Sequence, residues 1–187
     1  MPAPSITGSR VYLRPPQRRD AEAFIEAARA SRREHGRWIS APATRERFTA
    51  YVHRYTRGVT PVTHAAFLLF TRDDDALAGV FNFSEIVHGG FLSTYLGYYG
   101  FTPHIGKGFM SEGMALALDV AFRQMKLHRV EANIQPTNLR SVALAESSGF
   151  TREGFSPRYV KIGGRWRDHL RFAMLAEDWR VLRKARA

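Results

Sequence analysis

Residues 97–114, Gly-Tyr-Tyr-Gly-Phe-Thr-Pro-His-Ile-Gly-Lys-Gly-Phe-Met-Ser-Glu-Gly-Met, decide the fold. Their pattern predicts the end of a strand, a short glycine-rich loop and the first turns of a helix. Gly106 and Gly108 permit a left-handed backbone and a close approach of the chain to a ligand. A helix start leaves N–H groups unpaired and carries partial positive charge. The stretch therefore predicts an anion site, most naturally for phosphate.

Spacing separates the phosphate-binding motifs that contain such a loop. A nucleotide-hydrolase loop has the pattern GxxxxGK followed by Ser or Thr. Here five residues separate Gly100 from Gly106, and Gly108 takes the place of the hydroxyl residue. A dinucleotide fingerprint would need glycine in place of Ser111 and parallel strands before the loop. Both motifs are disfavoured, and a strand-to-helix turn without a ligand stays open as the alternative.

The composition is that of a globular protein with a basic surface. The 187 residues include 28 Lys and Arg against 17 Asp and Glu, a formal net charge of +11. Such a charge attracts polyanions, including nucleic acid, the ribosome and cofactor phosphates, although it can also be a solvated basic surface. The chain has no cysteine, which excludes disulfides, thiolate metal sites and a cysteine nucleophile. With no membrane span or signal peptide in the pattern, we expect a cytoplasmic protein and no metal.

The order of periodicities predicts a single α/β domain, residues 1–187 with a core of about 10–179. Alternation of apolar and polar residues predicts seven strands, and helical spacing with capping residues predicts the helices between them. Asp20 and Thr44 are the expected N-caps of the first two helices. The expected order is β-α-α-β-β-β-α-β-α-β-β around a mixed, mostly antiparallel sheet with helices on both faces. The strands are expected at 10–15, 64–71, 77–87, 91–99, 129–134, 151–162 and 165–175.

Several segments, taken in chain order, resemble the GNAT superfamily of N-acetyltransferases. Residues 103–108 resemble the family's pyrophosphate loop, Gln/Arg-x-x-Gly-x-Gly/Ala, with Pro103 at the first position. Residues 133–150 resemble its second motif, N-x-x-S followed by a short helix and Gly-Phe. Residues 79–84, 95–98 and 164–169 are similar to the ribosomal-protein-alanine N-acetyltransferases, the RimJ branch.

The resemblance implies a cofactor and its place. Acetyl-CoA is expected in a V-shaped splay between the fourth and fifth strands, 91–99 and 129–134, where its pantetheine bonds to the backbone as an added strand would. A bulge expected near 97–99 would free an N–H for the thioester carbonyl. The implied cofactor contacts are Tyr98, Tyr99, His104, Ile105, Gly106, Lys107, Gly108, Phe109, Met110 and Asn138.

The resemblance also implies direct attack by an amine in a ternary complex. Ser141 matches a serine that protonates the leaving thiolate, and Tyr95 stands where some relatives have a glutamate base. An α-amine has a reference pKa of ~7.7–8.0, so a weak base or a water chain suffices. Glu85 is the expected substitute base and His88 the second choice. The alternative for Glu85 is an exposed strand carboxylate.

The acceptor is less defined by the sequence. Trp38, Tyr159, Trp166 and His169 match positions near the acceptor groove of relatives, although simple packing explains them almost as well. The first hypothesis is acetylation of a protein N-terminus, such as that of a ribosomal protein, with docking on rRNA through the basic surface. A small amine such as an antibiotic, amino acid or amino sugar is the second hypothesis. A non-catalytic RNA- or ribosome-binding module is the third. A monomer or a homodimer is expected.

Overall fold

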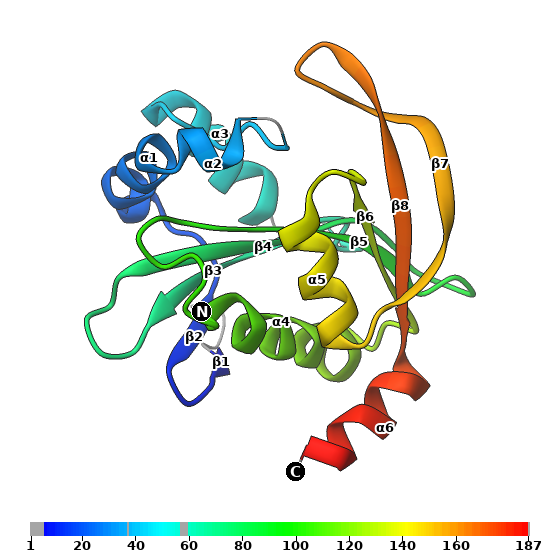
Figure 1. The fold of residues 1–187 in the computed structure, drawn as a ribbon. Coiled ribbons are helices and arrows are strands. Elements are labelled where there is room, and N and C mark those ends of the chain that lie inside the picture. Colours follow the sequence, from blue (N-terminus) through cyan, green and yellow to red (C-terminus); the bar gives the residue numbers. More distant parts are fainter. Residues whose placement is uncertain (1–5, 37, 57–59, 187) are drawn as a thin grey trace.

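A computed structural model describes residues 6–36, 38–56 and 60–186, which form one open sheet with helices on both faces (Figure 1). The sheet order is β1-β2-β3-β4-β5-β6-β8-β7, and only the β5–β6 pair is parallel. The strands are β1 Ile6–Thr7, β2 Val11–Arg14, β3 Ala65–Thr71, β4 Leu77–Val87, β5 Ser93–Gly100, β6 Arg129–Ile134, β7 Thr151–Ile162 and β8 Arg165–Leu175. The predicted mixed sheet is confirmed. All seven expected strands form, and the two-residue β1 adds an eighth.

The helices divide between the two faces of the sheet because the strands alternate. Leu68 of β3 packs in one apolar cluster with α1 and α3, whereas the adjacent Leu69 packs in the other cluster with α4. Figure 1 shows α1, α2 and α3 gathered on one side and α4 and α5 on the other. The helices are α1 Ala21–Ala30, α2 Arg32–His35, α3 Arg45–Thr56, α4 Phe109–Asp119, α5 Leu139–Ser148 and α6 Ala176–Arg186. None of those described is long and apolar enough to cross a membrane.

The sheet opens between β5 and β6. Their parallel pairing runs from Ser93 with Arg129 to Tyr95 with Glu131 and goes no further. The second half of β5 therefore has β4 on one side and no strand on the other. This is the splay expected between the fourth and fifth strands.

One predicted cap is wrong and another is confirmed. The side chain of Asp20 makes no capping bond to α1. It accepts two hydrogen bonds of 2.7 Å from the Arg14 guanidinium and one of 2.8 Å from the Gln17 N–H. Asp20 has helical backbone angles, φ −78° and ψ −2°, whereas a capping residue is normally extended, so its side chain is not directed at the first turn of α1. Thr44 Oγ1 does cap α3, accepting from the Arg47 N–H at 3.3 Å.

Helix α4 is largely covered and lies close to the sheet. Gly113, Met114, Ala117 and Leu118 are its buried residues. A Cβ on Gly113 would stand 2.8 Å from Leu69 Cδ1, so the helix approaches β3 closer than a larger side chain allows. This contact fixes the helix start that follows the glycine loop.

Candidate active site

A cavity of about 730 Å³ lies at the splay, between β5, the glycine loop and α5. It is called the cofactor cavity below. Such a volume is within the range of small-molecule sites. Its lining comprises Glu34, His35, Trp38, Ile39, Tyr98, Tyr99, Gly100, Ile105, Gly106, Gly108, Met110, Ser111, Thr137, Asn138, Leu139, Arg140, Ser141, Ala143 and Leu144.

The glycine loop has the geometry of an anion cradle. Gly106 and Gly108 adopt φ of +85° and +81°, in the left-handed region that favours glycine. A Cβ on Gly106 would meet no atom within 4 Å, so this backbone borders open space. The first intrahelical bond of α4 comes from the Glu112 N–H to the Gly108 carbonyl, 3.2 Å, which leaves the preceding N–H groups without helical partners. These residues fit a pyrophosphate.

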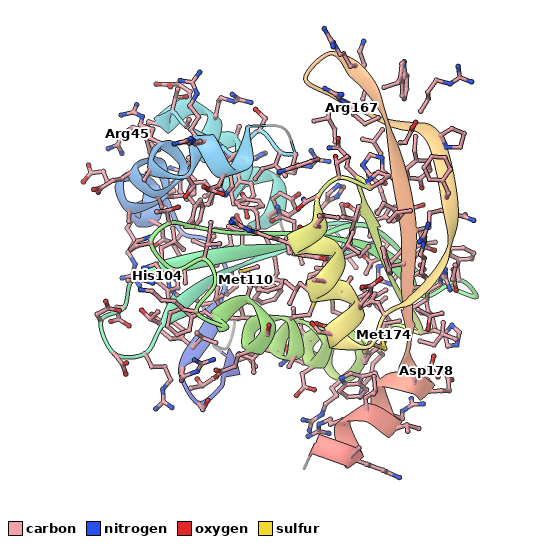
Figure 2. The ribbon with its side chains drawn as sticks, viewed as in Figure 1. Arg45, His104, Met110, Arg167, Met174 and Asp178 are labelled. Atoms are coloured by element: carbon pink, nitrogen blue, oxygen red, sulfur yellow. The ribbon has the colours of Figure 1, made fainter. Side chains whose placement is uncertain are left out.

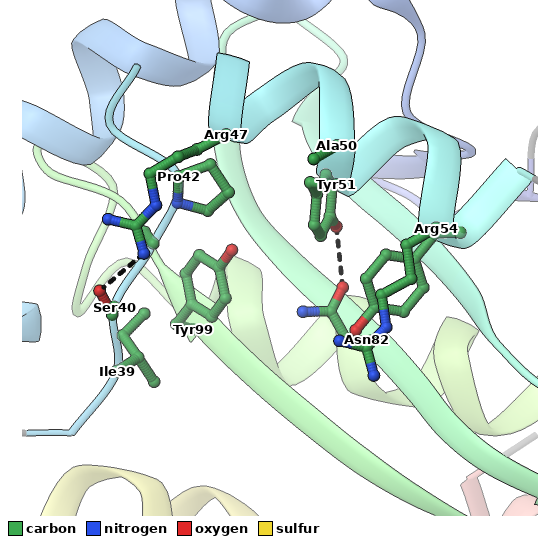
Figure 3. A pocket seen from close by; sticks show the side chains of 11 residues that line it. Ile39, Ser40, Pro42, Arg47, Ala50, Tyr51, Arg54, Asn82 and Tyr99 are labelled. Carbon is green, nitrogen blue, oxygen red and sulfur yellow. Dashed lines mark hydrogen bonds between the residues drawn. The ribbon is translucent and has the colours of Figure 1, made fainter. Parts of the chain in front are cut away.

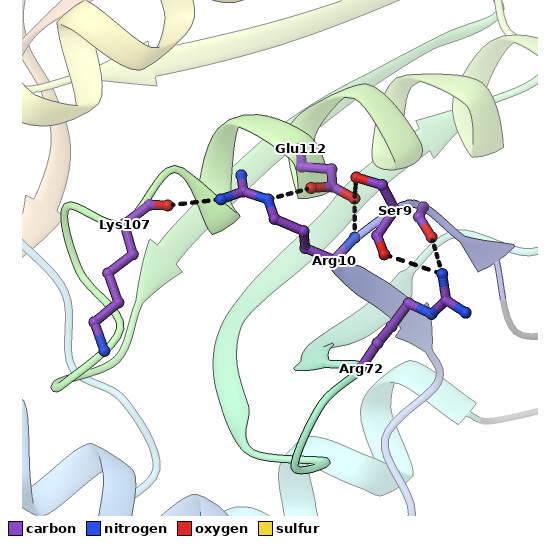
Figure 4. A network of polar contacts seen from close by, with 6 residues as sticks. Ser9, Arg10, Arg72, Lys107 and Glu112 are labelled. Carbon is purple, nitrogen blue, oxygen red and sulfur yellow. Dashed lines mark hydrogen bonds and ion pairs between the residues drawn. The ribbon is translucent and has the colours of Figure 1, made fainter.

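A polar network fastens this loop to the start of the sheet (Figure 4). The Glu112 carboxylate accepts from the Arg10 N–H at 2.8 Å, from Ser9 Oγ at 3.1 Å and from Arg10 Nε at 3.1 Å. Arg10 Nη1 also donates to the Lys107 carbonyl at 3.2 Å. Burial acts to raise the pKa of Glu112, but the hydrogen bonds from Arg10 and Ser9 outweigh it and hold the pKa below its usual value. Ser9 and Arg10, near the N-terminus, therefore hold the glycine loop in place.

The open edge of β5 offers backbone groups to the cavity. The Phe101 N–H donates to Ala78 of β4, so alternation turns Gly100 and Tyr98 toward the splay. The Gly100 carbonyl accepts instead from His35 Nε2–H at 2.7 Å. The backbone of Tyr98 thus faces the cavity.

The bulge predicted near 97–99 is wrong. The β4–β5 register is regular from Gly79 opposite Gly100 to Ser84 opposite Tyr95 and shifts only between Ser84 and Val87. The irregularity is on β4, where Glu85 has φ of +49°. No bulge is needed to free an N–H on β5, because the splay itself removes the neighbouring strand.

Two bonds connect α5 to the cavity wall. Asn138 Oδ1 caps the helix by accepting from the Ser141 N–H at 3.3 Å, and its amide NH₂ retains two donors. Tyr98 Oη donates to the Ser141 carbonyl at 2.7 Å, across the splay. Burial raises the pKa of Tyr98 far above its usual value, so the hydroxyl stays a donor.

The sequence did not indicate the contribution of α2. Glu34 and Arg140 both line the cavity and form an ion pair of 2.9 Å between α2 and α5. His35 is buried, and its pKa is lowered, mainly by that burial. Its partner Gly100 lies 65 residues away in sequence, which no local pattern signals.

Most predicted cofactor residues line the cavity, and three do not. Tyr98, Tyr99, Ile105, Gly106, Gly108, Met110 and Asn138 belong to its lining, as do Ser141 and Trp38. The side chains of His104, Lys107 and Phe109 lie elsewhere. The centroid of the His104 ring lies 5.9 Å from that of the Phe109 ring. The backbone N–H of His104 donates to the Phe101 carbonyl at 2.8 Å. Figure 2 shows Met110 beside the sheet and His104 on the outer side of the loop. Pro103 also lies outside the lining. Its lack of a backbone N–H therefore removes no donor from the cofactor cavity.

The remaining aromatic candidates gather at the β7–β8 hairpin. Tyr159 Oη and Tyr95 Oη are 3.5 Å apart, and the Tyr159 ring is 5.8 Å from that of His169. The contact with Tyr159 and burial raise the pKa of Tyr95 to about 12, so Tyr95 keeps its proton at neutral pH. Burial lowers the pKa of His169, and Trp166 is 61% exposed. None of these four lines the cofactor cavity.

Of the two predicted bases, Glu85 lies in the β4 irregularity and His88 follows the end of β4. The Glu85 side chain is 64% exposed, and its carboxylate is 3.6 Å from His64 Nε2. His88 Nε2–H donates to the Val62 carbonyl at 2.8 Å. Neither lines the cofactor cavity, and the roles of all these side chains in catalysis stay predictions.

The splayed strand, the anion cradle and the capped helix define a site of the acetyl-CoA-dependent acyltransferase class. Residues 10–151 match the family model of the acetyltransferase (GNAT) domain. The chain belongs to the GNAT family and is an acetyl-CoA-dependent N-acetyltransferase.

Similar proteins agree with this assignment. The chain is 33% identical over 183 residues to the probable N-acetyltransferase YjcK of Bacillus subtilis, covering 92% of this chain and 98% of that protein. It is 41% identical over 113 residues to the ribosomal protein uS5-alanine N-acetyltransferase of Escherichia coli, which covers 60% of this chain and 58% of that enzyme. The structure of Mycobacterium smegmatis RimJ in complex with a CoA disulfide superposes with a TM-score of 0.84 at 27% identity, covering 94% and 88% of the two chains. A spermidine N(1)-acetyltransferase of Vibrio cholerae is 33% identical over 76 residues, 41% of this chain and 44% of that enzyme.

Proposed function

We propose that this N-acetyltransferase acetylates the N-terminal α-amine of a protein, such as a ribosomal protein. The observation that carries the proposal is the similarity to the uS5-alanine N-acetyltransferase, which is higher in identity than the similarity to the spermidine enzyme. The exposed basic residues of the β7–β8 hairpin, Arg158, Lys161 and Arg165, support docking on rRNA.

Acetyl-CoA supplies an acetyl thioester. In the proposal, the N–H groups of Gly106 and of the first turn of α4 hold its pyrophosphate, and Asn138 donates its amide from α5. The Tyr98 N–H, which faces the splay, donates to the carbonyl oxygen as negative charge develops there. The amine nitrogen forms a bond to the acetyl carbon, the carbon–sulfur bond breaks, and the Ser141 hydroxyl gives its proton to the thiolate while it takes a proton from water.

The attacking amine must lose a proton. A substantial neutral fraction of an α-amine exists near pH 7, so water can accept it. Glu85 stays the predicted base, with His88 as the second choice; the Glu85 carboxylate is 3.6 Å from His64 Nε2. Glu85→Gln tests this, because a large fall in kcat with little change in KM is expected only when the carboxylate takes part in proton transfer.

Peptide acetylation tests the function directly. The purified enzyme is given acetyl-CoA with a peptide that begins with Ala and contains one Lys. The matched peptide has a formylated N-terminus, and spermidine serves as the small-molecule amine. Mass increase on the free N-terminus alone is the expected result. Acetylation of the formylated peptide or of spermidine at an equal or higher rate contradicts the proposal.

A further inference from the structure

A second cavity, of about 400 Å³, lies on the α3 side of the sheet (Figure 3). It is called the α3 cavity below. Ile39 and Tyr99 line both this cavity and the cofactor cavity. Tyr99 is on the unpartnered half of β5, directly after Tyr98, whose backbone faces the splay. A group bound in the α3 cavity is therefore adjacent to the cofactor cavity.

The charged side chains that line the α3 cavity are both cationic. Arg47 and Arg54 of α3 lie at opposite ends, with Tyr99 and Asn82 between them (Figure 3). No carboxylate is among its lining residues as the structure describes them. Arg47 Nη2 donates to the neutral Ser40 Oγ at 3.4 Å. Arg54 Nη2 lies 3.0 Å from His64 Nε2, and the Glu85 carboxylate lies 3.6 Å from the same nitrogen. Arg54 is thus partly compensated.

The neutral polar groups add donors rather than acceptors. Tyr51 is buried, and its hydroxyl donates to Asn82 Oδ1 at 2.8 Å. The Asn82 carbonyl is thereby engaged, and its NH₂ group, which also interacts with the Tyr99 hydroxyl, adds N–H donors to the lining. Two guanidinium groups and an amide NH₂ are a lining that suits a carboxylate and opposes a polycation.

We infer that the α3 cavity selects acceptors that carry a carboxylate close to the reactive amine, namely protein N-termini with Asp or Glu at the second or third residue. The inference rests on the proposed function and adds the chemical class of the acceptor. Arg47 and Arg54 hold the acidic side chain of the acceptor. The reactive amine then lies near Tyr99, where the α3 cavity adjoins the cofactor cavity. A polyamine meets two positive charges in the same place.

Matched peptides test the inference in the wild-type enzyme. Peptides beginning Ala-Glu, Ala-Gln and Ala-Lys differ in charge at one side chain, and kcat/KM is measured for each at low ionic strength. One partly exposed ion pair corresponds to about a fivefold preference for Glu over Gln. Ala-Lys is expected to be slowest, and added salt is expected to reduce the differences.

Variants then identify the arginines. In the double variant Arg47→Gln with Arg54→Gln, the kcat/KM for the Ala-Glu peptide divided by that for the Ala-Gln peptide is expected to fall to about one. The dissociation constant of CoA is expected to stay unchanged. Arg45→Gln is the matched control, since Arg45 starts the same helix but pairs with Glu22 at 2.9 Å and points to the outer side (Figure 2). Its ratio is expected to equal that of the wild type.

The outcomes separate this inference from the proposed function. Equal kcat/KM for the Glu and Gln peptides overturns the inference and leaves N-terminal acetylation standing. A preference that survives in the double variant overturns the assignment to these arginines. Acetylation of spermidine but of no peptide overturns both the inference and the proposed function.

Discussion

A carboxylate placed on the glycine loop should weaken the binding of acetyl-CoA. The variant is Gly106→Glu. Gly106 has φ of +85°, and a Cβ there meets no atom within 4 Å, so the new side chain costs backbone strain but no clash. The left-handed region costs an L-residue about 1–2 kcal/mol. For a chain of this size we expect a melting temperature lower by roughly 2–8 °C.

The effect on the ligand is larger and electrostatic. At 4 Å, two unit charges repel by about 1 kcal/mol in water and about 4 kcal/mol at an effective dielectric constant of ~20. Gly106 is exposed, so the lower figure applies. Against a pyrophosphate of about two charges, the repulsion is about 2 kcal/mol, or a roughly 30-fold rise in the dissociation constant.

The control is Gly89→Glu, measured beside it by calorimetry with CoA. Gly89 has φ of +73° and also has no neighbour within 4 Å of a Cβ, but it lies in the turn before β5. Gly89→Glu therefore adds the same backbone strain and the same charge, but far from the expected position of the pyrophosphate. We expect the melting temperatures of both variants to fall and only the Gly106 variant to lose affinity. Intact affinity in Gly106→Glu would refute our placement of the pyrophosphate.

Three further changes probe the supports of the site. Gly113→Val should lower the free energy of unfolding by about 1–3 kcal/mol in urea, since its Cβ would be 2.8 Å from Leu69 Cδ1; an unchanged midpoint would contradict that close packing. Tyr98→Phe removes the bond to the Ser141 carbonyl and should cost about 1 kcal/mol and weaken CoA binding; a variant as stable as wild type would argue against this bond. Burial lowers the pKa of His35, so as pH falls below ~6.5 the unfolded chain binds a proton that the folded one refuses, and stability falls. The decrease in stability between pH ~7.5 and ~5.5 should be smaller in His35→Gln, and equal slopes would exclude His35 as the source.

The parts of the site that depend on local backbone chemistry were predictable. Gly106 and Gly108 adopt left-handed conformations, as their place in the strand–loop–helix pattern required. Asn138 caps α5 because an amide oxygen three residues ahead of Ser141 can reach its N–H. The splay followed from the resemblance rather than from periodicity, since alternation in a strand does not reveal which strand lies beside it.

The parts that depend on long-range packing were not predictable. Glu85 was expected near the reacting groups, yet an irregularity in β4 turns it toward His64. A bulge is a property of two strands, so the glycine in β5 could not locate it. The α3 cavity, likewise, exists because of how α3 packs on β4 and β5, which no single segment of sequence encodes.

The network of Ser9, Arg10, Lys107 and Glu112 makes the glycine loop rigid before any ligand arrives. A flexible loop would lose conformational entropy on binding, whereas a loop already fixed by the folded chain loses little. The affinity for the cofactor is therefore partly set by residues about a hundred positions earlier in the chain. Shortening the chain past Arg10 would release the loop, and the resulting loss of affinity would be expected in the binding entropy.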